Sequence, residues 1–508
     1  MEAPNHGASF LRLCKESNKM MRKAFSLTLA LAIAFAAGIG AFAEGAAPKM
    51  EAGFFFNLFP MFEYTTQAQV TTGSAISDEA FGEFYNKPTF GSGGVYLNKG
   101  PITAIGIMEF QQDIWSKLYK HSIINLPDSA TGWTPDIIGL GTFYPNVGYV
   151  DYNSDGIRLS LGRRKIKDGP GTYGLGISSS NPFYDHVAAS LAIPIGTGKL
   201  GYDYVAVGMQ RWGSSVNPKY YFFHRASWTG KYFTIGINEY TLIANTTPDF
   251  QDWGPFLFYH NLFNSNQNVM AGFDFNWTPS KTFSFYGQFV MDDFMLSTET
   301  GTNPTALGMT AGADLNLIPG SSAMGAKYYD SDYAYYVGRS QVAKGGLNLR
   351  VEGYLMSRYL YRRDASKTDE AFTSQYEVMS NWTQGYVDGR PFLATPLSPD
   401  TALGRLALSW VDNPLEASFA FEYRLLGSES GMKTYSYSTV DYANWLLPSS
   451  PTTQLAFMLD GKYRLSGKSM ATAGVKLVLD AGSPAVTLNA GFAHQFAAGV
   501  GPTIKSTK

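Results

Sequence analysis

The sequence predicts an all-β fold, a transmembrane antiparallel β-barrel of the outer-membrane type with about 16 to 18 strands. Three observations support this prediction: apolar and polar residues alternate along many segments, these segments run to about ten residues or more, and charged residues are scarce. Of the 508 residues, 45% are apolar, 15% aromatic and 16% charged. A soluble domain usually carries about 25% charged residues. Much of the exterior is therefore expected to face something other than water.

The clearest hairpin lies between residues 268 and 293. Apolar residues occupy every second position on both sides of a proline-containing turn, which is the pattern of an antiparallel hairpin with one apolar face. We expect Phe273 and Phe285 to face lipid, while Asp274 and Gln288 face the lumen. The same alternation recurs in segments 347–358, 405–424, 454–479 and 485–496.

A soluble β-sandwich or lectin would produce the same alternation, because it also buries one face of each sheet. Strand length favours a barrel, since about ten residues suit a tilted bilayer span. Aromatic residues near strand ends and the alternation of short turns with long connections favour it too. Because every backbone polar group must be paired in hydrocarbon, the strands are expected to close into a ring.

The first 43 residues are predicted to be an upstream extension followed by a cleaved signal peptide. Met20–Lys23 is basic, Ala24–Gly40 is apolar, and Ala41–Ala43 forms a small-residue cleavage site. The mature chain is expected to start near Glu44. A membrane anchor is the alternative interpretation, although the apolar run is short for a span.

These features predict the outer membrane of a Gram-negative-type (diderm) bacterium as the location, after cleavage near Ala43. The expected partners are the lipid bilayer and the barrel-assembly machinery. A net charge of -2 gives no reason to expect nucleic acid. The only cysteine, Cys14, precedes the apolar run, so the mature chain is expected to lack thiol chemistry.

Residues 44–508 are predicted to form a single barrel domain, whose first part, 44–145, is the least regular. Segments 53–64 and 102–110 are expected to be strands. The spacing of apolar residues also predicts a short helix over 108–121, and a periplasmic element in this region stays open.

A basic cluster comes directly before a glycine-rich turn. The cluster consists of Arg163, Arg164, Lys165 and Lys167, and the turn of Asp168, Gly169, Pro170 and Gly171. One interpretation is a binding site for an anionic glycan, since clustered cations raise the local potential. The other is a strand end anchored at lipid head groups. No phosphate-binding glycine motif opens a helix here.

Several short motifs between residues 150 and 295 resemble the Wzi family of capsule-assembly outer-membrane proteins. They comprise the turn 168–171, Leu175, Asn181, Pro182, 228–241, 259–261, Asn268, Tyr286, Gln288, Asp292 and Asp293. The resemblance implies a large barrel with a lectin-like role in attaching exported capsular polysaccharide to the cell surface. A helical bundle such as that family's is not evident near the N-terminus, and the C-terminal half matches only as strands.

Two acidic pairs raise an enzymatic alternative of the omptin protease type, in which paired groups activate a water. They are Asp185-His186 and Asp292-Asp293. Adjacent residues of a strand point to opposite faces, so Asp292 and Asp293 could converge only in a loop or a bulge. We therefore predict a protein that is not an enzyme, with no catalytic residue, no cofactor and no metal.

Two functions remain: a polysaccharide-binding barrel and a general porin for small solutes. They share a fold, so the state of the lumen separates them. Bulky residues at expected lumen positions favour a plugged barrel; they are Arg350, Glu352, Tyr354 and Arg358.

Overall fold

A computed structural model describes most of the chain from Met50 onward. The described residues are 50–66, 91–112, 140–142, 147–180, 183–209, 218–248, 253, 267–294, 303–320, 334–339, 345–364, 366, 378–381, 386–389, 397–430, 435, 439–480 and 484–500. Met50–Lys508 forms one compact unit. Residues 1–43 lie outside the described part, so signal cleavage near Ala43 stays a prediction.

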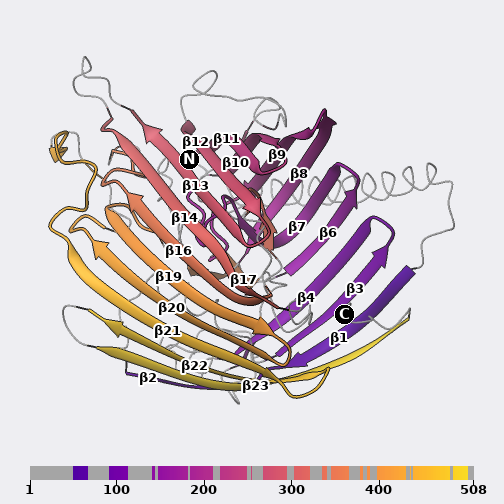
Figure 1. The fold of residues 1–508 in the computed structure, drawn as a ribbon. Coiled ribbons are helices and arrows are strands. Elements are labelled where there is room, and N and C mark those ends of the chain that lie inside the picture. The colour runs from indigo at the N-terminus through magenta and orange to yellow at the C-terminus, as the bar shows by residue number, and fades with distance from the viewer. Residues whose placement is uncertain are drawn as a thin grey trace, which may run out of the picture. The chain divides into compact units, whose positions relative to one another are not determined.

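Eighteen antiparallel strands close into a barrel within the described residues, as the sequence predicts. The ring closes where β1 (Met50–Leu58) pairs with β23 (Ala485–Val500), and the other strands follow around it in chain order (Figure 1). They are β3 (Gly91–Lys99), β4 (Ile102–Gln112), β6 (Val147–Ser154), β7 (Ile157–Lys167), β8 (Tyr184–Ile195), β9 (Gly198–Gly208), β10 (Lys219–Thr229), β11 (Phe233–Ala244), β12 (Gln267–Ser280), β13 (Phe283–Asp293), β14 (Ala306–Pro319), β16 (Gly346–Met356), β19 (Thr401–Asp412), β20 (Leu415–Leu426), β21 (Thr452–Arg464) and β22 (Ser469–Leu479).

Five short strands complete the described set. β2 (Met61–Thr65) continues the line of β1 along β23, and β5 (Leu140–Thr142) pairs with the end of β4. β15 (Ala334–Tyr336) pairs in parallel with β7. β17 (Val378–Asn381) and β18 (Tyr386–Gly389) form a separate sheet.

The described residues of the irregular first part of the chain lie mostly in strands. The strands predicted over 53–64 and 102–110 correspond to β1, β2 and β4. The predicted helix is wrong over 108–112, because these residues extend β4. There β4 pairs with β3 and then β5, and this pairing overrides a local helical spacing. Residues 113–121 lie outside the described residues.

The barrel is of the outer-membrane type, with an apolar outer face and a polar inner face. In the hairpin of β12 and β13, Phe273 and Phe285 point outward and are 42% and 40% exposed. Asp274 and Gln288 point inward and are only 2% and 3% exposed. This confirms the predicted phase of the hairpin. Inward polar residues are buried because other parts of the chain occupy the lumen.

The connections differ at the two rims of the barrel. One rim, here the turn rim, carries the short connections 100–101, 155–156, 196–197, 230–232, 281–282, 413–414 and 465–468. The other, the loop rim, carries long ones such as 168–183, 357–400 and 427–451. In barrels of this class short turns face the periplasm and long loops the outside. In the part of the chain that the structure describes, no helix is long and apolar enough to cross a membrane.

Two neighbouring residues of β21 test the assignment of faces. Leu459 points outward and is 54% exposed, and Asp460 points inward opposite Ser418. Leu459→Lys should cost about 2 to 4 kcal/mol of barrel stability near the membrane midplane, whereas Asp460→Lys should cost far less. Urea titration of the folded barrel in lipid vesicles measures both. Equal losses would contradict the assigned phase.

Candidate functional site within the barrel lumen

Two segments enter the lumen from the wall. Residues 168–180, the crossing segment, continue from β7 at the loop rim, and β15 comes from the connection between β14 and β16 at the turn rim. β15 runs parallel to the end of β7, with Tyr335 opposite Ile166. The backbone N–H of Val337 also donates to the carbonyl of Lys167 at 2.9 Å. The last residues of β7 thus bind β15 and Val337 inside the barrel.

Glycines allow the crossing segment to turn and to approach the wall closely. Gly169 has a φ of 72°, in the left-handed region that favours glycine. A Cβ there would also collide with the side chain of Gln288. At Gly176 a Cβ would collide with the ring of Tyr240. These two positions explain why the segment is rich in glycine.

Asp168 anchors the start of the crossing segment. Its carboxylate accepts hydrogen bonds from the backbone N–H of Ile177 at 3.0 Å, the hydroxyl of Tyr240 at 2.7 Å and Nε2 of Gln288 at 2.5 Å. The backbone N–H of Gly176 also donates to it. Burial raises the pKa of the Asp168 carboxyl, and these hydrogen bonds oppose that rise. One carboxylate therefore fixes a turn of the segment to β11 and β13.

The apolar residues of the crossing segment pack as in a soluble core. Leu175 and Ile177 are fully buried in one cluster with inward side chains of the wall, among them Tyr221, Phe223 and Leu242. The hydroxyl of Tyr361 donates to the carbonyl of Leu175 at 2.6 Å. This side of the lumen is filled by side chains.

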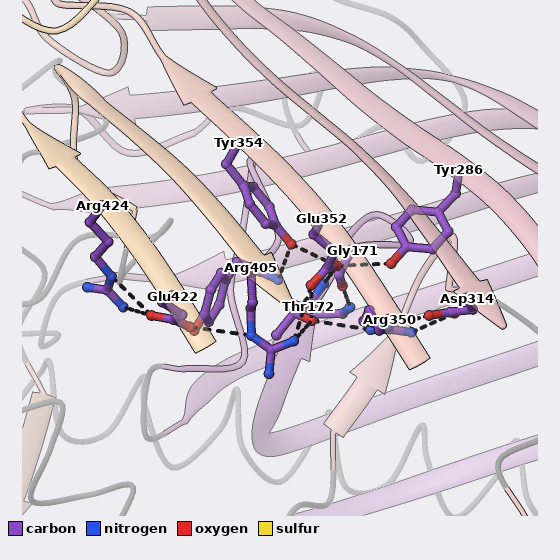
Figure 2. A network of polar contacts seen from close by, with 12 residues as sticks. Gly171, Thr172, Tyr286, Asp314, Arg350, Glu352, Tyr354, Arg405, Glu422 and Arg424 are labelled. Atoms are coloured by element: carbon purple, nitrogen blue, oxygen red, sulfur yellow. Dashed lines mark hydrogen bonds and ion pairs between the residues drawn. The ribbon is translucent and has the colours of Figure 1, made fainter. Parts of the chain in front are cut away.

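Glu352, on β16, holds the middle of the crossing segment (Figure 2). Its carboxylate accepts from the backbone N–H of Thr172 at 2.7 Å and from the Thr172 hydroxyl at 2.5 Å. The hydroxyls of Tyr286 and Tyr354 each donate to it at 3.0 Å. Arg405 donates to it at 3.3 Å. A fully buried carboxylate is stable only with such compensation.

The end of the network reaches the opposite wall. The hydroxyl of Tyr173 donates to Glu422 on β20 at 2.8 Å, and β20 lies roughly half-way round the ring from β7. Burial, together with the neighbouring Glu422, raises the pKa of Tyr173, so the hydroxyl stays protonated and can donate. The crossing segment therefore spans the lumen from one wall to the other.

Two further ion pairs complete this part of the wall. Arg350 forms two hydrogen bonds with Asp314, at 2.6 and 2.8 Å. Arg424 donates to Glu422 at 2.6 and 3.1 Å. The two N–H donors of Arg350 meet different oxygens of Asp314, and a bidentate pair of this kind has a fixed geometry. Asp314, Glu352 and Glu422 are thus each paired with at least one guanidinium.

The residues of the predicted basic cluster do not share one face. Arg163 points outward and pairs with Asp185 at 2.6 Å, whereas Arg164 points inward and pairs with Asp151 at 3.0 Å. Lys167 is buried and donates to the carbonyl of Gly171. Lys165 lies opposite Ala334 of β15 and is half-buried. Glycan binding by these cations stays a prediction.

Several residues of the family-like motifs converge on the crossing segment. Gln288 contacts Asp168 and also accepts from the backbone N–H of Leu175 at 3.3 Å. Tyr286 reaches the same segment through Glu352. Gly169, Pro170 and Gly171 are buried in it, whereas Asn181 and Pro182 lie outside the described residues.

The acidic residues weighed for a protease lie on strands that are not neighbours. Asp185 and His186 belong to β8, and Asp292 and Asp293 to β13. Asp185 pairs with Arg163, and His186 shares a hydrogen bond of 2.9 Å with Ser160. Asp293 pairs with Arg363. Among the described residues no group of three acidic, histidine or cysteine side chains could hold a metal ion.

Arg405, Glu422 and Tyr240 are central to the network, but sequence reasoning did not single them out. Each lies at an inward position of an alternating strand. A charged residue at such a position was the available signal for Arg405 and Glu422. Which segment each would meet could not be read from the alternation.

The fold and the lumen place this chain in the class of outer-membrane β-barrels. No protein-family model matches the chain, and curated protein sequences provide no match either. Several solved barrels are similar in structure. Wzi of Escherichia coli, described as an outer-membrane protein involved in group 1 capsule assembly and a carbohydrate-binding β-barrel, is 14% identical, with 88% of this chain and 85% of that chain covered and a TM-score of 0.49. OpdO of Pseudomonas aeruginosa is 9% identical, with coverage of 89% and 98% and a TM-score of 0.43. A loop-deletion mutant of OmpT, an outer membrane protein of Vibrio cholerae, is 8% identical, with coverage of 88% and 99% and a TM-score of 0.35.

Asp168→Asn tests the anchor of the crossing segment. The amide nitrogen would face groups that are themselves donors, which should cost about 1 to 3 kcal/mol. We expect limited proteolysis to cut the crossing segment faster in this variant, while the barrel stays heat-modifiable. Asp155→Asn, in an exposed turn at the turn rim, is the matched control. Equal cleavage rates in both variants would show that Asp168 does not hold the segment.

Proposed function

We propose that this barrel binds surface polysaccharide of the capsular type at the outer membrane, without performing chemistry on it. The observation that carries the proposal is the crossing segment, whose polar contacts reach β11, β13, β16 and β20. A lumen filled in this way favours a binding protein over a conducting one. The resemblance of residues 150–295 to the Wzi family supports polysaccharide as the ligand class.

A general porin for small solutes is the second candidate. Its support is that the inward residues of β19 to β22 are mostly less buried than those of β10 to β13. A water-filled path along that side of the wall would suit small solutes. The bulky lumen residues oppose it, because Arg350, Glu352 and Tyr354 all contact the crossing segment or its partners.

Binding and conductance measured on the same refolded protein separate the two functions. We expect signals for acidic polysaccharides on a glycan array, together with single-channel conductance well below that of an open barrel. The crossing segment is the reason, since it contacts opposite walls of the lumen. Full conductance with a blank array would favour the porin instead.

The basic cluster supplies a test of where the polymer binds. Arg163 and Lys165 lie in the last residues of β7. The double variant Arg163→Gln with Lys165→Gln should assemble, because the side chain of Asp185, the partner of Arg163, is 58% exposed and stays solvated, and it should retain less surface polysaccharide. The difference from the unaltered barrel should shrink as the salt concentration rises, because salt screens charge attraction beyond about 8 Å at physiological ionic strength and so weakens it in both proteins. Flow cytometry of surface glycan at two salt concentrations measures the loss.

Arg164→Gln is the contrasting variant. Arg164 is buried against Asp151 and lies 3.8 Å from the centre of the Tyr149 ring, so its loss should cost about 1 to 3 kcal/mol of barrel stability. We expect impaired assembly rather than a selective loss of glycan. If the double variant keeps all of its polysaccharide while it assembles well, the outer cations are not the binding site.

A further inference from the structure

Three arginines stand side by side on the lumen wall next to the crossing segment. Arg350, Arg405 and Arg424, here the arginine row, belong to β16, β19 and β20, which are consecutive neighbours in the sheet. Figure 2 shows their guanidinium groups in sequence, with Thr172 between those of Arg405 and Arg350. Arg350 and Arg405 both donate to the Thr172 hydroxyl, at 3.3 and 3.2 Å.

The acidic partners of the row lie behind it. The side chains of Asp314, Glu352 and Glu422 are 11%, 0% and 2% exposed. Those of Arg350, Arg405 and Arg424 are 25%, 15% and 25% exposed. The arginine side chains are therefore more accessible from the lumen than the carboxylates that they pair with. The accessible surface of the site consists mainly of hydrogen-bond donors.

The buried acceptors are already occupied by the protein. Glu352 accepts from both donors of Thr172, from two tyrosine hydroxyls and from Arg405. Glu422 accepts from Tyr173 and Arg424 and forms an ion pair with Arg405. A ligand at this surface must thus bring its own acceptors. A planar carboxylate suits guanidinium groups best, because it can accept two parallel N–H bonds.

We propose that the arginine row is a lumenal site for the carboxylate of an acidic saccharide, a uronate. The choice of a sugar rests on the proposed function. It is supported by the half-buried Tyr173 beside the row, which offers an aromatic ring to a sugar. Three arginines against three carboxylates leave the site neutral, so binding depends on short-range geometry and only weakly on salt. This separates the arginine row from the outer cations Arg163 and Lys165.

Titration calorimetry of the full-length barrel in detergent micelles tests the site with glucuronate and with glucose. We expect glucuronate to bind and glucose to bind at least about tenfold more weakly, since only glucuronate carries the charge-assisted acceptor. Arg424→Gln should weaken glucuronate binding about tenfold, because it removes one exposed guanidinium. Lys462→Gln changes a cation that faces the lumen from β21 outside the row, and it should leave the affinity unchanged.

Arg350→Gln provides a second variant, which is useful if Arg424→Gln loses its heat-modifiable fold. Equal affinities for glucuronate and glucose, or unchanged glucuronate binding in a folded Arg424→Gln or Arg350→Gln variant, would overturn the site. Glucuronate binding with a blank glycan array would keep the arginine row as a site for small carboxylates and refute polysaccharide binding. Polysaccharide binding that both variants retain in full would keep the proposed function and refute the row.

Discussion

The need to pair every backbone polar group in hydrocarbon governs this structure. A bilayer offers no water to an unpaired N–H or C=O, so the strands must form a ring without edges. The pairing of β1 with β23 closes that ring, and β2 extends the same seam along β23. Closure in turn fixes the two faces of each strand, because successive side chains must alternate between lipid and lumen. The barrel architecture therefore accounts for a polar inward face, whatever the function of the protein.

A polar lumen creates a second requirement once protein fills it. Glu352 and Asp168 are buried where the crossing segment meets the wall, and a buried carboxylate is costly unless charges and donors surround it. The network meets this cost with arginines from the wall and with hydroxyl and backbone donors from both sides. Breaking one contact would leave a desolvated charge, so the crossing segment and the wall stabilise each other. The same arrangement leaves the outer edges of Arg350 and Arg424 in contact with the lumen.

The alternation of apolar and polar residues predicts much of the fold but little of the site. The phase of the hairpin around Phe273 and Phe285 and the range of strand numbers follow from a period of two and from strand length. Alternation assigns a face to Arg405 or Glu422, but the segment that this face meets comes from β7, more than 200 positions away in the chain. Nothing local encodes such a contact. The helical spacing after Ile107 was misleading for the converse reason, because pairing with β3 and β5 outweighed it.

The glycine-rich turn is interpreted differently from its sequence and from its position in the fold. Taken as sequence, four cations ahead of a shaped turn suggest either a binding site for an anionic glycan or a strand end anchored at lipid head groups. In the fold, the turn lies inside the barrel, and its anchor Asp168 bonds to Gln288 and Tyr240 of the wall. The cations do not form one patch, because Arg163 and Arg164 point to opposite faces of β7. A motif that resembles a family signature at this place thus reflects, first of all, the geometry needed to bring a chain segment into a lumen. Under the proposed function, a ligand would therefore meet the side chains that this segment leaves accessible, among them those of the arginine row.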